Sequence, residues 1–232
     1  MTSLSTVLFT TRMRGLALRY IVFTLGLYLL AAGIVLIVRS TLGTTPISSI
    51  NYVISLNTPL TLGTCTFIIN MLLIAGQFWL IRKRRTRRDQ IEILLQIPFS
   101  FIFSAFIDIN MALTAGVVPA SYTHSILLLL AGCIVQALGV VLEIKPHVVM
   151  MSAEAFVRYA SENTHREFGK FKVWFDVSLV TTAILLSLLL TQRIEGVREG
   201  SLIAALCTGY IVTFLNTRII TRRNLRRLLP HH

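Results

Sequence analysis

Six long stretches without a charged residue constrain this chain more than any other feature. They are Tyr20–Val38, Gly63–Ile81, Ile93–Ile107, Ser125–Leu142, Val177–Gln192 and Gly200–Thr217. An α-helix of roughly 20 residues crosses the ~30 Å hydrocarbon layer of a bilayer. Spanning strands would instead alternate polar and apolar residues. The stretches therefore predict six transmembrane helices.

The composition agrees with an integral membrane protein. Of the 232 residues, 54% are hydrophobic and only 14% are charged, whereas a soluble domain carries about 25% charged residues. Cys65, Cys133 and Cys207 each lie alone in an apolar stretch, which is typical of buried packing residues rather than of a disulfide or a metal site. We expect a single integral membrane domain over residues 1–232, embedded in the lipid bilayer, with no metal and no cofactor.

The basic residues gather on one side of the predicted helices. Of the 22 Lys and Arg residues, only Arg39, Arg193 and Arg198 fall on the other side. This positive-inside asymmetry predicts that both termini lie in the cytoplasm. The basic loops are expected to attract anionic lipid headgroups. Because a topology signal explains the net charge of +12, nucleic-acid binding is not expected.

The second half of the chain repeats the first at a fixed offset of 106 residues. Over the 48 positions from Gly26 to Leu73, ten residues are identical to their counterparts with no gap, and the pattern S-x-N-T-x4-G occurs in both copies. Each unit, about 18–112 and about 125–217, holds three predicted helices. Since three is odd, the second unit must be inverted in the membrane, as in many secondary transporters. The expected fold is an all-α membrane protein with six transmembrane helices in two inverted three-helix repeats.

Short connectors follow the first and fourth predicted helices, and each predicts a short helix. In the first, the T-T-P sequence at 44–46 is a typical helix start. Residues 46–56 are too few to span, so they predict either a re-entrant half-helix or a helix on the membrane surface. In the second, a charge recurs every four residues from Glu154 to Arg166 beside an apolar face, which predicts an interfacial amphipathic helix.

Five segments carry a likeness to a known family. They are S-T-L-G-T-T-P-I-S-S-I at 40–50, T-L-G-T at 61–64, L-L-Q-I-P at 94–98, F-I-D at 106–108 and G-K-F-K-V-W-F-D at 169–176. With them the chain resembles the YczE/YyaS/YitT-type bacterial integral membrane protein family over about residues 20–220. The resemblance implies a multi-pass protein of the bacterial cytoplasmic (inner) membrane and carries over no activity. The second connector departs from the family pattern, because V-V-M-M-S-A-E stands where a Pro-Gly-rich turn is often found.

Polar residues inside predicted spans are costly to bury in lipid, which makes them candidates for a functional site. We expect a substrate site near the membrane midplane, formed by Thr45, Ser48, Asn70, Gln77, Ser104 and Asp108. Asp108 and Asp176 are candidates for proton coupling, and Asp176 falls on Asn70 under the 106-residue offset. The hydroxyls and helix start at 44–49 would suit a small anionic solute.

Structural roles compete with these assignments. Asn70 and Gln77 could join helices through hydrogen bonds. Asp176 could pair with Lys172, and Asp108 could simply face solvent. Close helix packing is the expected role of four glycines spaced seven apart in two pairs, Gly26, Gly33, Gly132 and Gly139.

The sequence contains none of the common catalytic or nucleotide-binding motifs, so an enzyme is not expected. The leading hypothesis is a permease-like carrier that moves a small solute by alternating access. The alternative is a non-transporting membrane scaffold or regulator, which would dock a partner through residues 82–88 and 148–162.

Overall fold

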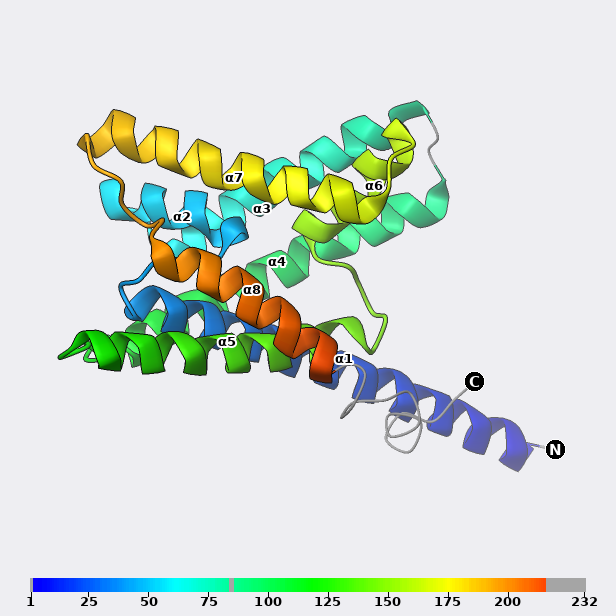
Figure 1. Cartoon of the computed structure of the whole chain (residues 1–232). Helices are drawn as coiled ribbons and strands as arrows, with labels where there is room; N and C mark the ends of the chain where they lie inside the picture. The colour runs from blue at the N-terminus through cyan, green and yellow to red at the C-terminus, as the bar shows by residue number, and fades with distance from the viewer. Residues whose placement is uncertain (1, 84–85, 216–232) are drawn as a thin grey trace.

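A computed structural model describes the backbone of residues 2–83 and 86–215 and the side chains of residues 15–82 and 86–215. Every regular element in these residues is helical (Figure 1). The elements are α1 (Thr2–Arg39), α2 (Pro46–Asn57), α3 (Leu62–Leu80), the 3-10 helix η1 (Ile81–Lys83), α4 (Arg87–Leu113), α5 (Tyr122–Ile144), α6 (Ser152–Thr164), α7 (Phe168–Thr191) and α8 (Glu199–Phe214).

Five helices in the described chain are long and apolar enough to cross a membrane, namely α1 from Gly15 onward, α3, α4, α5 and α7. The protein is therefore a multi-pass membrane protein, and the part of it that the structure describes is all-helical. The sixth predicted span corresponds in position to α8, which has 16 described residues. Its predicted end at Thr217 lies outside the described residues.

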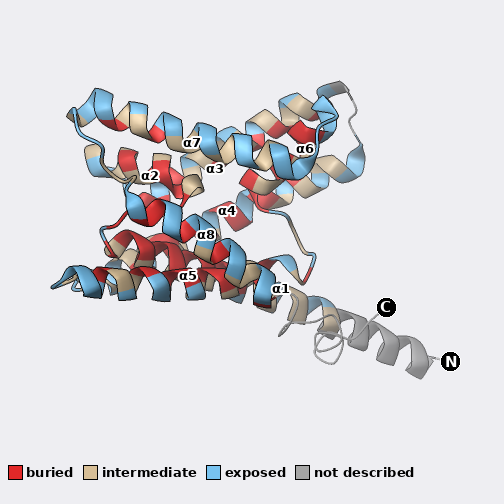
Figure 2. Ribbon diagram, in the orientation of Figure 1, coloured by how far each residue is buried: buried red, intermediate tan, exposed pale blue. Residues whose placement is uncertain are grey.

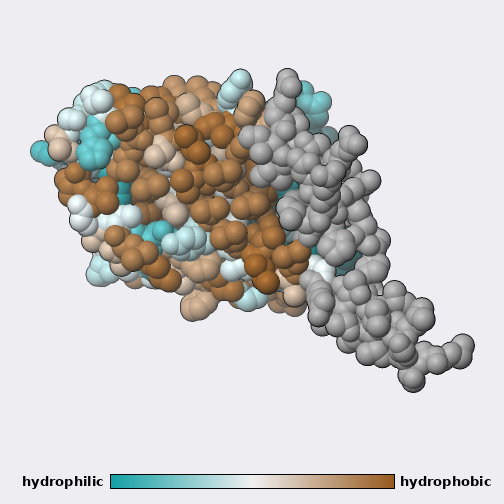
Figure 3. Space-filling view, turned by 90° about the horizontal axis from the view of Figure 1, so that it is seen from below, coloured by the Kyte–Doolittle hydropathy of each residue, from teal (hydrophilic) through white to brown (hydrophobic). Residues whose placement is uncertain are grey.

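The outer surface of the helices is apolar, as a lipid environment requires. Viewed from the side of α5, most of the described surface is hydrophobic, and hydrophilic residues gather toward one end (Figure 3). Leu127 and Ile134 of α5 and Leu206 of α8 are among the exposed residues. Buried residues concentrate where the helices face one another (Figure 2).

α1 and α5 lie antiparallel in very close contact, because glycines allow their backbones to approach. A Cβ atom added to Gly26 would lie 2.6 Å from the backbone nitrogen of Glu143, and one added to Gly132 would lie 2.9 Å from that of Ile37. Gly33 and Gly139 face Gln136 and Leu30 in the same way. The prediction that these four glycines mark close helix packing is confirmed.

The glycine contacts between α1 and α5 are related in pairs by the 106-residue offset. Gly26 contacts Glu143, and its repeat counterpart Gly132 contacts Ile37, which is the counterpart of Glu143. The helix starts follow the same offset, since α2 and α6 begin at Pro46 and Ser152 and α3 and α7 begin at Leu62 and Phe168. These two pairs of helix starts and the glycine contacts thus follow the repeat offset, whereas the starts of α4 at Arg87 and α8 at Glu199 do not.

Both predicted connector helices are present, as α2 and α6. α2 packs between α3 and α7, and α6 packs on the same two helices. α6 is covered by protein over residues 152–161, where Glu154 and Arg158 are half-buried, and its interfacial position stays a prediction. Small residues on more than one face, including Ala153, Ala155 and Ala160, allow neighbouring helices to cover α6.

The two ends of the molecule differ in charge. We call the end where α3 and α5 finish and α4 and α7 begin the basic end; it lies on the right in Figure 1 and includes Arg82, Arg88 and Lys172. The opposite end is where α1 finishes and α5 and α8 begin. There Arg39 donates to the backbone oxygen of Met111 at 2.7 Å.

Candidate functional site

Polar side chains form a seam along one face of α3. Thr66, Asn70 and Gln77 are four and seven residues apart, so they share that face, and all three are buried. Near the opposite end, Asn51 of α2 donates its amide to the hydroxyl of Thr66 at 3.2 Å. We call Thr66, Asn70 and Gln77 the α3 seam.

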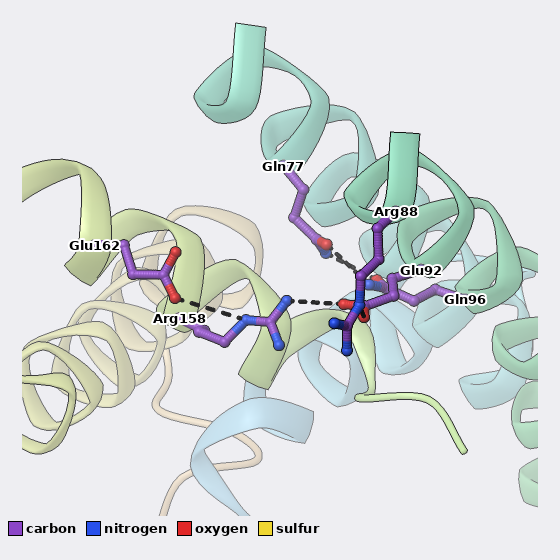
Figure 4. Close-up of polar contacts among 6 residues, drawn as sticks. All are labelled: Gln77, Arg88, Glu92, Gln96, Arg158 and Glu162. Atoms are coloured by element: carbon purple, nitrogen blue, oxygen red, sulfur yellow. Dashed lines mark hydrogen bonds and ion pairs between the residues drawn. The ribbon is translucent and has the colours of Figure 1, made fainter. Parts of the chain in front are cut away.

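The middle of the seam contacts the first residue of α6. The hydroxyl of Ser152 donates to Asn70 Oδ1 at 2.7 Å. The backbone oxygen of Ser152 accepts from Gln77 Nε2 at 3.0 Å. Toward the basic end, Gln77 and Gln96 of α4 exchange two amide hydrogen bonds of 2.9 Å each (Figure 4). The seam thus joins α2, α4 and α6 to α3.

The seam is not fully satisfied. Four buried polar atoms at or beside it have no hydrogen-bond partner within the described structure, and these are Asn51 Oδ1, Asn70 Nδ2, Ser100 Oγ and Ser104 Oγ. Most buried polar atoms in proteins form a hydrogen bond, so a buried atom without a partner needs a physical explanation. Free donors and acceptors on α2, α3 and α4 give the interior spare capacity to bind a polar group.

The predicted site residues at the start of α2 bond mainly to one another. Thr45 is the N-cap residue and Pro46 the first helical residue, as expected. The Thr45 hydroxyl does not cap the helix but donates to Ser48 Oγ at 3.1 Å. Ser49 donates to the backbone oxygen of Pro46 at 2.7 Å. Neither Thr45 nor Ser48 lines the two clefts described below.

Asp108 has a structural role that the sequence analysis did not foresee. Its carboxylate accepts from the backbone nitrogen of Gly63 at 2.8 Å and from the hydroxyl of Thr61 at 2.7 Å. An acid at this place satisfies free N–H groups at the start of α3 and opposes the positive end of the helix dipole. Asp108 therefore caps α3 from α4 at the opposite end.

Asp176 lies in an ion pair with Lys172. The Lys172 Nζ atom is 2.6 and 2.9 Å from the two carboxylate oxygens of Asp176, one turn farther along α7. This is the local pairing that competed with a coupling role. Of the six predicted substrate residues, the structure joins only Thr45 to Ser48 directly. Asn70 and Gln77 meet through Ser152.

A cleft of about 470 Å³ opens at the basic end, between α4, α5, α6 and α7. We call it the basic-end cleft. Its wall includes Gln96, so it reaches the partner of Gln77 in the α3 seam. Its charged and titratable lining residues are Glu92, Glu143, His147, Glu154, Arg158 and Lys172.

Both cations of the basic-end cleft have carboxylate partners. Arg158 Nη2 donates to Glu92 at 3.1 Å and lies 4.0 Å from Glu162 through Nε (Figure 4). Lys172 binds Asp176. Glu143 and Glu154 make no hydrogen bond or ion pair within the described part of the chain. Burial raises the pKa of Glu154, the charge of Lys172 lowers it, and that of Asp176 raises it.

A smaller cleft of about 240 Å³ lies at the opposite end, and we call it the opposite-end cleft. Part of its wall is the repeat counterpart of the basic-end cleft. Five of its residues map onto lining residues of the basic-end cleft under the 106-residue offset or its reverse: Val38 onto Ile144, Thr41 onto His147, Gly43 onto Val149, Tyr52 onto Arg158, and Arg198 onto Glu92. The molecule thus has one related cleft at each end.

The sequence analysis did not bring the charged residues of the basic-end cleft together. It did not single out Glu143, and it placed Glu154 and Arg158 on the polar face of an interfacial helix. Packing partly explains the position of Glu143, since Gly26 brings α1 against the backbone at residue 143. The sequence pattern that could have identified Glu143 is its spacing from Gly139. The two residues are one helical turn apart, so Glu143 lies on the same helix face as the packing glycines.

A family model described as a family of unknown function, DUF6198, matches residues 17–217. The chain belongs to this family. No curated protein and no solved structure matches it. Membership of the DUF6198 family assigns no activity to the chain. The clefts and the α3 seam are the features that bear on its function. The resemblance to the YczE/YyaS/YitT-type family stays a prediction.

Proposed function

We propose that this DUF6198 protein is a carrier that moves a small solute across a membrane by alternating access. In this proposal the two units are inverted repeats of three spans each, with α8 completing the sixth span. α2 and α6 are half-helices of the two units. Inverted-repeat transporters bind solute between their halves, and the rocking of one half against the other opens the site to either side.

The single observation that carries the proposal is the correspondence between the two clefts. Lining residues of the opposite-end cleft become lining residues of the basic-end cleft when the repeat offset is applied. A pair of equivalent entrances at opposite ends is what alternating access requires. The unequal volumes, about 470 and about 240 Å³, fit a state that is more open at the basic end.

The polar interior leads from the basic-end cleft toward the opposite end. Gln96 links the wall of the basic-end cleft to Gln77, and the seam continues through Asn70 to Thr66. α2 returns along α3, since Asn51 contacts Thr66. The start of α2 is therefore directed toward the middle of α3. The start of α6 lies there too, because its first residue, Ser152, contacts Asn70. Two half-helix starts near the midplane favour re-entrant connectors over surface helices.

The orientation follows from the charges. The basic end carries most of the Lys and Arg residues, which are retained in the cytoplasm when bacterial membrane proteins insert. We therefore propose a bacterial inner-membrane location with the basic end and both termini inside. Anionic lipid headgroups would gather around that end.

The scaffold alternative has less support. Its proposed docking helix, 148–162, is largely covered, because α6 packs on α3 and α7. Val157 and Ala160 are buried. No feature of the described residues favours a protein partner over a solute.

Solute counterflow tests the proposal. Purified protein is reconstituted into liposomes loaded with a mixture of small amines and carboxylates, and uptake of each labelled solute is followed. A carrier gives saturable exchange of at least one solute, reduced at least tenfold by Asn70→Ala. Asn163→Ala, on the exposed end of α6, is the matched control and should leave exchange unchanged. Absence of exchange for every solute would contradict the carrier.

A further inference from the structure

Two carboxylates in the basic-end cleft have no cation of their own. The cleft is lined by Glu92, Glu143 and Glu154 against Arg158 and Lys172. Arg158 is held by Glu92 at 3.1 Å, and Lys172 is held by Asp176 at 2.6 Å. After this pairing, Glu143 and Glu154 are left with negative charges that nothing in the described chain neutralises by direct contact.

Of the two carboxylates, Glu143 gives the stronger evidence for a bound cation. Its residue is only 4% exposed, yet its side chain lines the cleft and has no bonding partner within the described chain. Burying a carboxylate without a partner costs several kcal/mol unless it is protonated or meets a cation. The backbone of residue 143 lies in close contact with α1 at Gly26, which fixes the point from which this side chain extends.

Glu154 approaches the same space from a different helix. It lies in the first turn of α6 and lines the cleft with Glu143 of α5. Because both residues line one cleft, their charges repel each other when both are ionised. Like charges that share a cleft raise the free energy of the empty site, and a bound cation lowers it.

We propose that the basic-end cleft binds a small organic cation, with an ammonium or guanidinium group between Glu143 and Glu154. This inference rests on the proposed carrier function and names the class of its solute. It replaces the anionic solute suggested by the start of α2, whose hydroxyls mainly bond to one another or to backbone oxygens. The volume of about 470 Å³ admits a metabolite-sized amine.

Protons compete with the cation at the same carboxylates. The other groups that face them are Glu92 from α4, His147 after α5, Arg158 from α6, and Lys172 with Asp176 from α7. Protonation of Glu143 and Glu154 removes their negative charge, so binding should weaken as the pH falls. An anionic solute would behave in the opposite way.

Equilibrium binding to the full chain in detergent tests the inference. Titration calorimetry uses putrescine and butylamine as amine probes and succinate as the anionic probe, all at one ionic strength. We expect an amine to bind saturably at pH 8, at least tenfold more weakly at pH 5, and at least tenfold more weakly to Glu143→Gln. Glu167→Gln is the matched control, since Glu167 is an exposed acid outside the cleft that pairs with Lys170, and it should bind as the native chain does.

A second measurement needs no variant. A carbodiimide is applied to the native chain, and mass spectrometry measures how far tetramethylammonium, an organic cation that cannot form an amide with the activated carboxylate, slows modification of Glu143. Protection supports the inference. Binding of succinate without binding of either amine, or full amine affinity in Glu143→Gln, would overturn it. Amine binding without counterflow would instead contradict the carrier and leave the cation site standing.

Discussion

The side-chain amides of Gln77 and Gln96 donate to each other, with both nitrogen–oxygen distances at 2.9 Å. The pair joins α3 to α4, and Gln77 also holds the backbone oxygen of Ser152. Both residues are almost fully buried, at 0% and 2% exposure. The pair therefore stands where the basic-end cleft meets the interior.

Replacing Gln77 by leucine should destabilise the protein by about 1–3 kcal/mol, because it leaves the buried amide of Gln96 and the Ser152 oxygen without partners. The thermal midpoint in detergent measures the effect. The double variant with Gln96→Leu should cost less than the sum of the two single changes, since the orphaned partner is also removed. Strict additivity would show that the amide pair does not form.

Gly63→Ala should destabilise the protein, whereas Gly169→Ala should not. A Cβ atom at Gly63 would meet the Asp108 carboxylate carbon at 2.5 Å and would also overlap the Ser104 backbone oxygen, while one at Gly169 meets nothing within 4 Å. Overpacking costs about 1–3 kcal/mol, and alanine is otherwise the better helix former. These two glycines are repeat counterparts, so thermal midpoints of the two variants form a matched comparison.

Asp108→Ala should destabilise α3 by about 0.5–2 kcal/mol through loss of its cap, with Asp108→Asn less harmful because the amide oxygen still accepts from Gly63. Thermal midpoints test the cap.

A coupling role for Asp108 makes a separate prediction, that Asp108→Asn alters the pH dependence of solute flux. An unchanged pH profile would reject coupling and leave the cap intact.

The raised pKa of Glu154 predicts a stability that falls as the pH rises. Because the folded chain holds this proton more tightly than the unfolded chain, the group's contribution is complete below the ordinary glutamate pKa and is lost as the pH passes through the raised value. Thermal midpoints from pH 4 upward should decline more steeply for the native chain than for Glu154→Gln. Identical slopes would contradict the burial of this carboxylate.

Much of the architecture could be predicted from the sequence, because apolar runs and a fixed repeat leave few alternatives. The start of α2 at Pro46 and the packing of Gly26 and Gly33 follow from local rules of capping and of helix contact. The position of α6 could not be predicted, because its alternating charges are also typical of an exposed helix. Which neighbours cover Ala153 and Ala160 depends on tertiary packing.

The site was harder to predict than the fold for the same reason. Asn70 and Gln77 were identified because polar residues in apolar spans stand out. The pairing of Asp108 with Gly63 joins residues 45 positions apart, which no local pattern reveals. Glu143 lies two residues before Lys145 in the sequence, a pattern as typical of a solvated helix end as of a cleft.

Cysteine accessibility tests the central claim most directly. Thr41→Cys and His147→Cys, one in each cleft and related by the repeat offset, are introduced separately into a chain whose three native cysteines are replaced by alanine. A membrane-impermeant thiol reagent is applied to intact cells and to inside-out vesicles. We expect Thr41→Cys to react in cells and His147→Cys to react in inside-out vesicles. Reaction of both from the same side would contradict two clefts that open to opposite faces of the membrane.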